Sequence, residues 1–256
     1  MVRPGSISAI MGIERIVTQF RRIIVTTGST ADVIAAMADV TQWLGFRHFA
    51  ISHHVDRAAG GKAIRLNNYP ARWVDYYERR ALGTVDPVHR ASHMTSEGFW
   101  WSDMPGLIRL NERDEEIMKL GRIQGIGQGF TIPNNLPGEV CGSCTFAAEQ
   151  GFIPDPVTQG LAQLAGLAAF SAAHRLWPGR SALPIGSRPV LTPQQSACVE
   201  LVARGKTNRQ IGQNLGIAEE TVASHIKNAC ERYGVNKRTS LVAFALLNGA
   251  IMLSKL

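Results

Sequence analysis

Residues 67–103 concentrate side chains that can hydrogen-bond a small molecule inside an apolar cavity. They include Tyr69, Trp73, Tyr77, Asp86 and Trp101. An indole N–H and a phenol O–H donate hydrogen bonds, a carboxylate accepts them, and aromatic rings supply apolar wall. However, tryptophans and tyrosines at helical spacing usually pack in a core, and an aspartate before a proline, as in Asp86-Pro87, is often a turn residue. Residue type alone therefore leaves ligand binding and packing both open.

Patterns for enzyme or metal chemistry are missing from the sequence. No G-x-S-x-G nucleophile motif occurs, and the histidines lack the clustered motif of a metal-dependent hydrolase. Cys141 and Cys144 have the spacing of a zinc knuckle or a redox pair, but a knuckle needs two further ligands and a redox pair should open a helix. We therefore expect no enzyme activity, no metal and no cofactor. The seven histidines are His48, His53, His54, His89, His93, His174 and His225.

Near the end of the chain, residues 219–233 have the pattern of a helix with one polar face. Val222, Ile226, Ala229 and Tyr233 are spaced by four, three and four residues, so they should face a small core. The side chains left outside can hydrogen-bond base edges or phosphates, although each of them could equally be a solvated surface residue. This pattern predicts a DNA recognition helix. Its candidate DNA contacts, together with Thr207 before it, are Thr221, Ser224, Lys227, Asn228 and Glu231.

The elements around this helix predict an all-α helix-turn-helix domain. Gly216-Ile217-Ala218 is a three-residue turn with glycine, and Thr207 with Gln210 three residues later forms a capping-box pattern. The four expected helices span residues 193–203, 208–215, 219–233 and 240–248.

The first part of the chain mixes helical and strand patterns. The adjacent strand pairs, joined at Gly60-Gly61 and at residues 134–138, indicate an antiparallel sheet layered with helices. We expect an α+β fold with an N-terminal α-β-α sandwich. Expected helices span 13–25, 31–44, 72–81, 112–124 and 156–176, and expected strands span 46–52, 63–66, 126–132 and 139–147.

Length and charge fit two domains with a polyanionic partner. Among 256 residues, 45% are hydrophobic, and a stretch rich in proline and glycine at 177–190 predicts a linker between domains 1–176 and 191–256. Residues 189–256 hold eight Lys and Arg against four Asp and Glu, a net +4 of the total +7. No apolar run of membrane-spanning length and no signal peptide occurs, so we expect a cytoplasmic protein with no membrane partner.

The tail resembles the LuxR-type helix-turn-helix. Two departures are Gln194-Gln195, where the family usually has Arg-Glu, and Ala218, where it usually has Ser. We expect both to lower stability and to leave DNA binding in place, since a lost N-cap commonly costs about 1 kcal/mol. The matching positions are Leu191, Thr192, Gly205-Lys206-Thr207, Ile211, Leu215, Ile217, Thr221-Val222, His225, Asn228, Gly234-Val235, Arg238 and Ala243.

The first domain resembles the autoinducer-binding domain of LuxR-type quorum-sensing receptors. The resemblance rests on Tyr69-Pro70, Trp73, Tyr77, Asp86-Pro87 and Trp101-Ser102. The gaps from Trp73 to Asp86 and to Trp101, 13 and 28 residues, are also similar to those of the family. A phosphoacceptor receiver domain fits poorly, because the strands are paired and no early acidic pair occurs.

This resemblance implies an acyl-homoserine lactone ligand. It assigns the amide N–H of the ligand to Asp86, the ring carbonyl to Trp73 and the acyl carbonyl to Tyr69, with Tyr77 and Trp101 as walls. Alternation along 139–147 places Cys144 on the far wall, where the family often has a hydroxyl. Ser143 serves instead if the register slips by one residue.

The resulting hypothesis is a ligand-responsive regulator. It binds an acyl or aroyl homoserine lactone and, as a homodimer, a near-palindromic operator. The alternative is a ligand-independent DNA-binding regulator with a degenerate sensor domain.

Overall fold

A computed structural model describes residues 18–55, 63–135, 140–177 and 189–252 of the chain. Two compact units divide these residues, the first ending at 177 and the second beginning at 189. Most of the predicted linker, the Gly60-Gly61 turn, residues 136–138 and the start of the first predicted helix lie outside the described residues.

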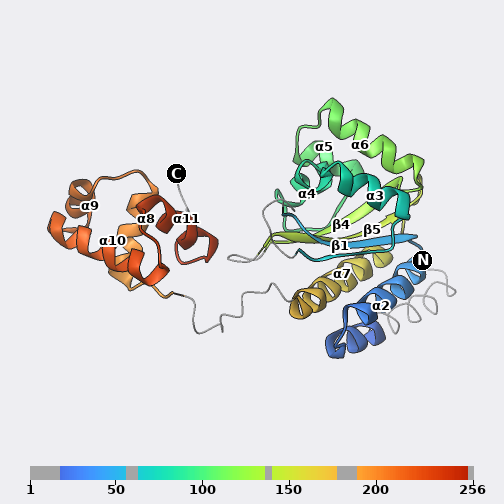
Figure 1. Cartoon of the computed structure of the whole chain (residues 1–256), viewed down its shortest axis with the longest axis horizontal. Helices are drawn as coiled ribbons and strands as arrows, with labels where there is room; N and C mark the ends of the chain where they lie inside the picture. The colour runs from blue at the N-terminus through green and yellow to red at the C-terminus, as the bar shows by residue number, and fades with distance from the viewer. Residues whose placement is uncertain (1–17, 56–62, 136–139, 178–188, 253–256) are drawn as a thin grey trace, which may run out of the picture. The chain divides into compact units, whose positions relative to one another are not determined.

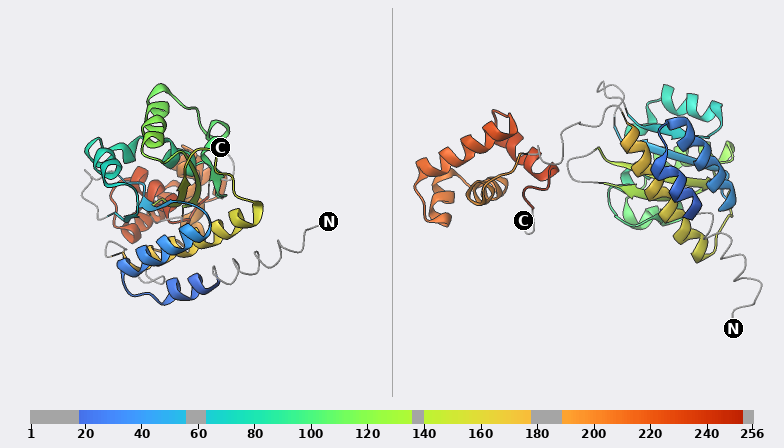
Figure 2. Two further views of the ribbon diagram at one scale, coloured as in Figure 1. Left: turned by 90° about the vertical axis from the view of Figure 1, so that its right-hand side faces the viewer. Right: turned by 90° about the horizontal axis from the view of Figure 1, so that it is seen from below.

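A five-stranded antiparallel sheet with the strand order β2-β1-β5-β4-β3 forms the middle layer of the first unit. Helix α2, the helical residues 18–26 and α7 cover one face, and α3 to α6 cover the other (Figures 1 and 2). The expected α-β-α sandwich is therefore confirmed. The strands are β1 His48–His53, β2 Arg65–Asn67, β3 Phe99–Trp100, β4 Gln128–Asn134 and β5 Gly142–Ala148.

The helices of this unit largely follow local start and stop signals. Ser29 caps α2 by accepting the Asp32 N–H at 3.1 Å, and Asn111 with Asp114 forms a capping box at the start of α6. Short elements between residues 82 and 107 carry too few residues for a periodic pattern, and they were not predicted. The helices are α2 Thr30–Trp43, α3 Ala71–Arg79, α4 Pro87–Ser92, α5 Met104–Leu107, α6 Glu112–Ile123 and α7 Pro156–Leu176.

The main core lies between the sheet and the layer of α2 and α7. Phe49 and Ile51 of β1 and Phe146 of β5 are fully buried there against Met37 of α2 and Ala165 of α7. Alternation along each strand sends the intervening side chains to the opposite face, beneath α3 to α6. That opposite face holds the cavity described below.

The second unit is the expected four-helix bundle, built from α8 Pro193–Ala203, α9 Asn208–Leu215, α10 Glu219–Tyr233 and α11 Arg238–Leu247. Gly216 adopts a φ of +67°, which ends α9 in the left-handed conformation that glycine favours. Val199, Ile211, Val222 and Leu241 are fully buried in its core.

Gln195, which departs from the family pattern, still supports the start of α8. Its side chain accepts the Thr192 N–H at 3.0 Å, while the Thr192 hydroxyl accepts the Gln195 N–H at 3.3 Å. A neutral glutamine thus completes the capping box at the start of α8. Ala218, in contrast, gives the start of α10 no side-chain cap.

Two further properties concern the described residues as a set. None of their helices is both long enough and apolar enough to cross a membrane. No cluster of three or more His, Cys, Asp or Glu side chains among them is placed to hold a metal ion.

Candidate ligand pocket and DNA-contacting helix

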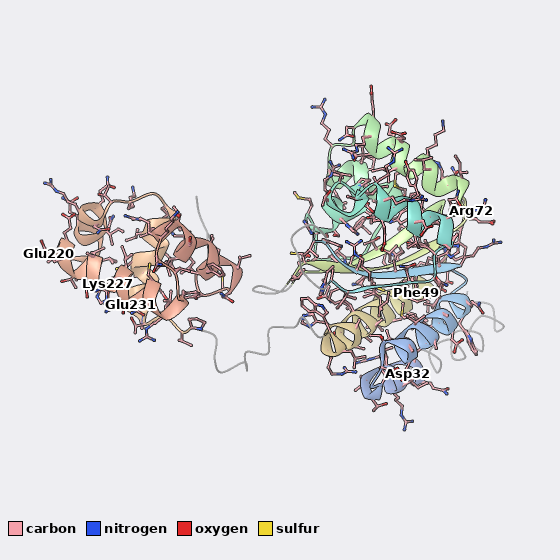
Figure 3. All side chains as sticks on the ribbon, in the orientation of Figure 1. Asp32, Phe49, Arg72, Glu220, Lys227 and Glu231 are labelled. Carbon is pink, nitrogen blue, oxygen red and sulfur yellow. The ribbon has the colours of Figure 1, made fainter. Side chains whose placement is uncertain are left out.

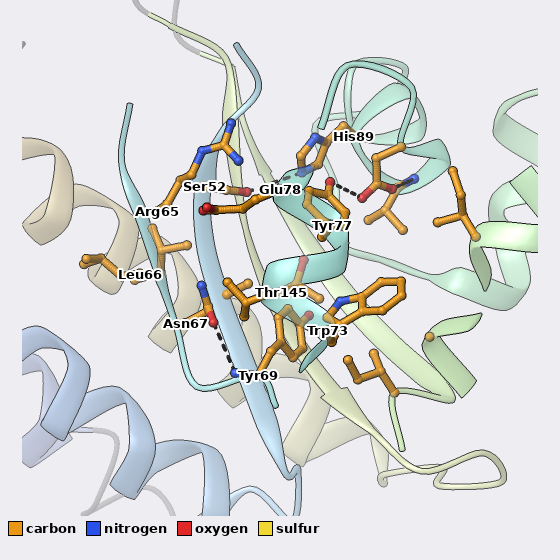
Figure 4. A pocket seen from close by; sticks show the side chains of 18 of the residues that line it. Ser52, Arg65, Leu66, Asn67, Tyr69, Trp73, Tyr77, Glu78, His89 and Thr145 are labelled. Atoms are coloured by element: carbon orange, nitrogen blue, oxygen red, sulfur yellow. Dashed lines mark hydrogen bonds between the residues drawn. The ribbon is translucent and has the colours of Figure 1, made fainter. Parts of the chain in front are cut away.

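A cavity of about 120 Å³ lies in the first unit between the sheet and α3, α4 and α6 (Figure 4). One buried water needs roughly 10–15 Å³, so this space suits a small molecule better than an isolated solvent molecule. All five residues of the predicted aromatic and acidic group line this cavity, namely Tyr69, Trp73, Tyr77, Asp86 and Trp101.

The sheet forms the floor of the cavity, and strand register arranges the side chains of this floor in rows. Residues two apart on a strand share a face, so neighbouring rows lie about 7 Å apart along the strands. The middle row consists of Asn67, Ala50, Thr145 and Thr131. The next row consists of Arg65, Ser52, Ser143 and Pro133.

Asp86 joins the two helices that form one side of the cavity. Its Oδ1 accepts the N–H of Val88 at 2.8 Å and so caps α4, and its Oδ2 accepts the Tyr77 hydroxyl at 2.5 Å. The aspartate is therefore a turn residue and a pocket residue at once. Burial, with Asp86 adding to it, raises the pKa of Tyr77 well above its usual range, so Tyr77 stays a donor. A carboxylate has further lone pairs, and Asp86 keeps accepting capacity for a ligand N–H.

Tyr69 and Trp73 present hydrogen-bond donors to the cavity. Trp73 is 8% exposed and packs on Ile117 and Ile126. Within the described parts of the chain, neither its indole N–H nor the Tyr69 hydroxyl has a hydrogen-bond partner. Burial raises the pKa of Tyr69, with Asp86 contributing next, so this phenol also stays protonated. A ligand with carbonyl oxygens would satisfy both donors.

Trp101 differs, because its own N–H is already used. The indole donates to Thr131 Oγ1 at 3.0 Å, and Thr131 Oγ1 lies 2.9 Å from Thr145 Oγ1. Its ring lies so close over Gly129 that a Cβ there would come within 2.4 Å of the ring. Trp101 is thus a wall of the cavity, and the Thr145 hydroxyl is the polar group that β5 supplies.

The expectation for Cys144 is wrong. This side chain is fully buried on the opposite face of β5, in the core shared with α7, and burial raises the pKa of its thiol. Ser143 points to the pocket side but bonds His54 Nε2 at 2.9 Å, and Thr145 lines the cavity in place of Cys144. All seven residues of β5 are buried, so hydrophobic alternation could not tell its two faces apart.

The predicted recognition helix is α10. Val222, Ile226 and Ala229 are buried and Tyr233 packs against them. Glu220, Lys227 and Glu231 follow one another along the helix (Figure 3). Lys227 Nζ lies 3.9 Å from Glu231 Oε1 with both side chains exposed, so this pair contributes little to stability. The predicted DNA contacts on α10 are all exposed, namely Thr221, Ser224, Lys227, Asn228 and Glu231.

The start of α9 adds groups to this surface. Thr207 is exposed but its hydroxyl caps α9 by accepting the Gln210 N–H at 3.3 Å. Lys206 and Arg209 beside it are exposed cations of the kind that contact phosphates, and their charge is visible in the sequence although they were not among the predicted contacts.

A small-molecule cavity in one unit and a helix-turn-helix in the other are the two parts expected of a DNA-binding regulator with a ligand-binding domain. The comparisons agree with this class. Residues 29–175 match the autoinducer binding domain, and residues 189–245 match the bacterial regulatory proteins of the luxR family. The chain belongs to the LuxR family of quorum-sensing transcriptional regulators, and it is a regulator and not an enzyme.

Similar proteins include one curated regulator and two proteins of solved structure. RpaR of Rhodopseudomonas palustris, a quorum sensing-dependent transcriptional regulator, is 31% identical over 212 residues, covering 82% of this chain and 84% of RpaR. Escherichia coli SdiA aligns with a TM-score of 0.58 at 21% identity over 92% of this chain and 99% of SdiA. The N-acylhomoserine lactone-dependent CepR2 of Burkholderia cenocepacia gives 0.53 at 14% identity over 67% and 99%. These two structural likenesses show the fold.

Proposed function

We propose that the first unit binds a homoserine lactone that carries an acyl or aroyl group, and that binding controls transcription through the second unit. The observation that carries the proposal is a pair of donors, Trp73 and Tyr69, to which the described residues offer no acceptor and which face the same cavity as the Asp86 carboxylate. A lactone with an amide link offers two carbonyl acceptors and one N–H donor. This set complements the three protein groups, and burial would be costly without such pairing.

The roles follow from this complementarity. Trp73 donates to the ring carbonyl, Tyr69 donates to the acyl carbonyl, and Asp86 accepts the amide N–H. Tyr77 keeps the carboxylate in place, and Trp101 walls the apolar part of the ligand. The Thr145 hydroxyl, which replaces the expected Cys144, is close enough to the cavity to reach the acyl carbonyl directly or through water.

For the DNA-binding unit, we propose a homodimer that acts in the cytoplasm on a near-palindromic operator, with α10 in the major groove. Two-fold symmetric proteins read two-fold symmetric sites, which supports this arrangement. Ligand bound to the folded first unit stabilises it by mass action and biases the arrangement of the two DNA-binding units.

Asp86→Asn tests the ligand assignment, with Lys227→Ala as the matched variant at the DNA end. Asparagine still caps α4, so the fold should persist, but it loses a charged acceptor. We expect a 10- to 100-fold weaker ligand response, from a charge-assisted bond of roughly 1.5–3 kcal/mol, with specific DNA contacts intact. Lys227→Ala should weaken operator binding in gel shifts and leave the ligand affinity unchanged.

Ligand binding can be measured directly by tryptophan fluorescence. All five tryptophans lie in the first unit, and two of them line the cavity. A panel of acyl and aroyl lactones should quench or shift this emission. An unchanged dose response in Asp86→Asn would make the pocket assignment wrong. If no lactone binds and operator affinity is constant, the ligand-independent alternative holds.

An acylglycerol is the competing ligand class, because SdiA has been solved in complex with octanoyl-rac-glycerol. Its glycerol hydroxyls can donate to Asp86 as the amide N–H of a lactone does, so Asp86→Asn should weaken the binding of either class. The two classes are therefore separated by comparing, in the fluorescence assay, the affinity of the unmodified protein for a lactone and for octanoylglycerol.

A further inference from the structure

One end of the cavity is unusually polar for a site that should hold an acyl group. Ser52, Arg65, Glu78 and His89 gather there, which we call the distal end, while Tyr69 and Trp73 occupy the opposite end (Figure 4). Ligand pockets are mostly apolar with a few placed polar groups. Glu78 brings an opposite charge to the same end as Arg65, so the feature to be explained is the buried Arg65 N–H described next.

Arg65 is placed on the cavity floor by strand register. It pairs with Ser52 across β1 and β2, so both side chains point into the cavity from one row. One Nη atom donates to the Val55 carbonyl at 3.5 Å, while the Nε is buried with no hydrogen-bond partner among the described residues. Gly83 lies against the guanidinium, since a Cβ at residue 83 would stand 3.6 Å from the Arg65 Nη2. A buried N–H donor without an acceptor is unfavourable, and a ligand oxygen would remove this penalty.

The neighbours of Arg65 supply acceptors. His89 Nδ1 lies 3.0 Å from the Gly83 carbonyl, which can only accept, so this nitrogen carries the proton. In the neutral ring the other nitrogen is then an acceptor, and Ser52 Oγ donates to it at 3.4 Å. The lone pairs of Ser52 remain available to accept a hydrogen bond. The distal end thus offers one donor and one acceptor side by side.

Resting on the proposed lactone function, we propose that the acyl or aroyl group of the ligand ends in a hydroxyl held by Arg65 and Ser52. A hydroxyl accepts from Arg65 and donates to Ser52, which matches both groups. A carboxylate matches less well because Glu78 adds negative charge at the same end. Ala147, which packs with Trp73, lies two rows from the row of Arg65, or about 13 Å along the strands. Because Trp73 is proposed to hold the lactone ring, the hydroxyl belongs at the far end of the acyl group.

The test compares paired ligands that differ in one oxygen. Hexanoyl- and 6-hydroxyhexanoyl-homoserine lactone form an alkyl pair, and phenylacetyl- and 4-hydroxyphenylacetyl-homoserine lactone form an aryl pair. Dissociation constants are measured on the full chain by tryptophan fluorescence. The variants are Arg65→Met and Ser52→Ala, with Arg47→Met as control, because Arg47 is an exposed arginine paired with Glu149 outside the cavity.

We expect at least tenfold tighter binding of the hydroxylated member in one pair. Arg65→Met should bring that ratio close to one while hexanoyl- or phenylacetyl-homoserine lactone still binds, which also shows that the variant is folded. Ser52→Ala should reduce the ratio in part, and Arg47→Met should keep it. A ratio near one in the unmodified protein, or a ratio that Arg65→Met preserves, overturns this inference alone. If no member of either pair binds, the inference fails together with the lactone proposal.

Discussion

At the scale of single residues, one side chain often serves packing and ligand binding together. Asp86 caps α4 and accepts from Tyr77 while it faces the cavity. Trp73 is a core residue by exposure and a pocket residue by position. Residue type left open whether these side chains pack in the core or contact a ligand. In the structure, Asp86 and Trp73 are placed to do both.

Gly129 shows how a residue without a side chain supports the pocket. Gly129→Ala should force the Trp101 ring out of place, because the new Cβ would lie 2.4 Å from it. Such overpacking typically costs about 1–3 kcal/mol. Urea unfolding followed by tryptophan fluorescence, which reports on the first unit, should show this loss in the free energy of unfolding.

The matched control is Gly160→Ala in α7, where a Cβ would meet nothing within 4 Å. Alanine is the better helix former, by about 0.5–1 kcal/mol, so this variant should be at least as stable as the unmodified protein. If Gly129→Ala were as stable as Gly160→Ala, the packing of Trp101 would not require a residue without a side chain at position 129.

At the scale of elements, helix capping shows that Gln195 and Ala218, which both depart from the family pattern, differ in their effect on stability. Gln195 preserves the capping box of α8, so the expected loss of stability does not come from that bond. Ala218 leaves α10 without a side-chain acceptor at the start of the predicted recognition helix. The start of α11 at Lys237 also has no side-chain cap, but only at Ala218 does the chain depart from the serine that is usual in the family.

Ala218→Ser should stabilise α10 by about 1 kcal/mol, because the hydroxyl can accept an N–H of the first turn. Hydrogen exchange over residues 219–233, read by mass spectrometry, should slow by several-fold. Ala223→Ser, at an exposed position inside the same helix, should bring no gain, since serine is a poorer helix former than alanine. Equal exchange in both variants would contradict the capping argument.

At the scale of the whole molecule, we expect buried histidines to make the first unit sensitive to pH. Burial first, and then His174, lowers the pKa of His53 from 6.5 to about 4. Burial lowers the pKa of His54 further, with His89 and His93 adding to it, and His54 Nδ1 lies 2.9 Å from His93 Nε2. These rings stay neutral in the folded chain at pH values where the unfolded chain takes up protons.

The free energy of unfolding of the first unit should therefore be highest above pH 6.5 and fall as the pH decreases toward 4. Each histidine that stays neutral removes about 1.4 kcal/mol per pH unit in this window. Urea titrations by tryptophan fluorescence at pH 7.5, 6 and 5 measure the slope. His53→Gln should flatten it, and His225→Gln in the second unit should leave it unchanged. A free energy of unfolding that is constant from pH 7.5 to 5 would contradict the argument that His53 and His54 stay neutral in the folded chain.

Local signals in the sequence determined much of this protein. Helices α7, α8, α9 and α10 begin and end at the predicted residues, because caps, glycines and apolar periodicity act within a turn or two of chain. The five aromatic and acidic pocket residues were named from the resemblance to the autoinducer-binding domain, and they line one cavity.

Tertiary structure decided what depends on strand pairing and on segments far apart in the chain. Burial on both faces hid the register of β5, so Thr145 rather than Cys144 faces the cavity. The polar distal end joins Ser52 of β1, Arg65 of β2 and His89 of α4, and no spacing within one segment could predict their meeting. Side-chain patterns describe one element at a time, whereas a pocket is a contact between elements, and its chemistry follows from which faces the fold turns toward each other.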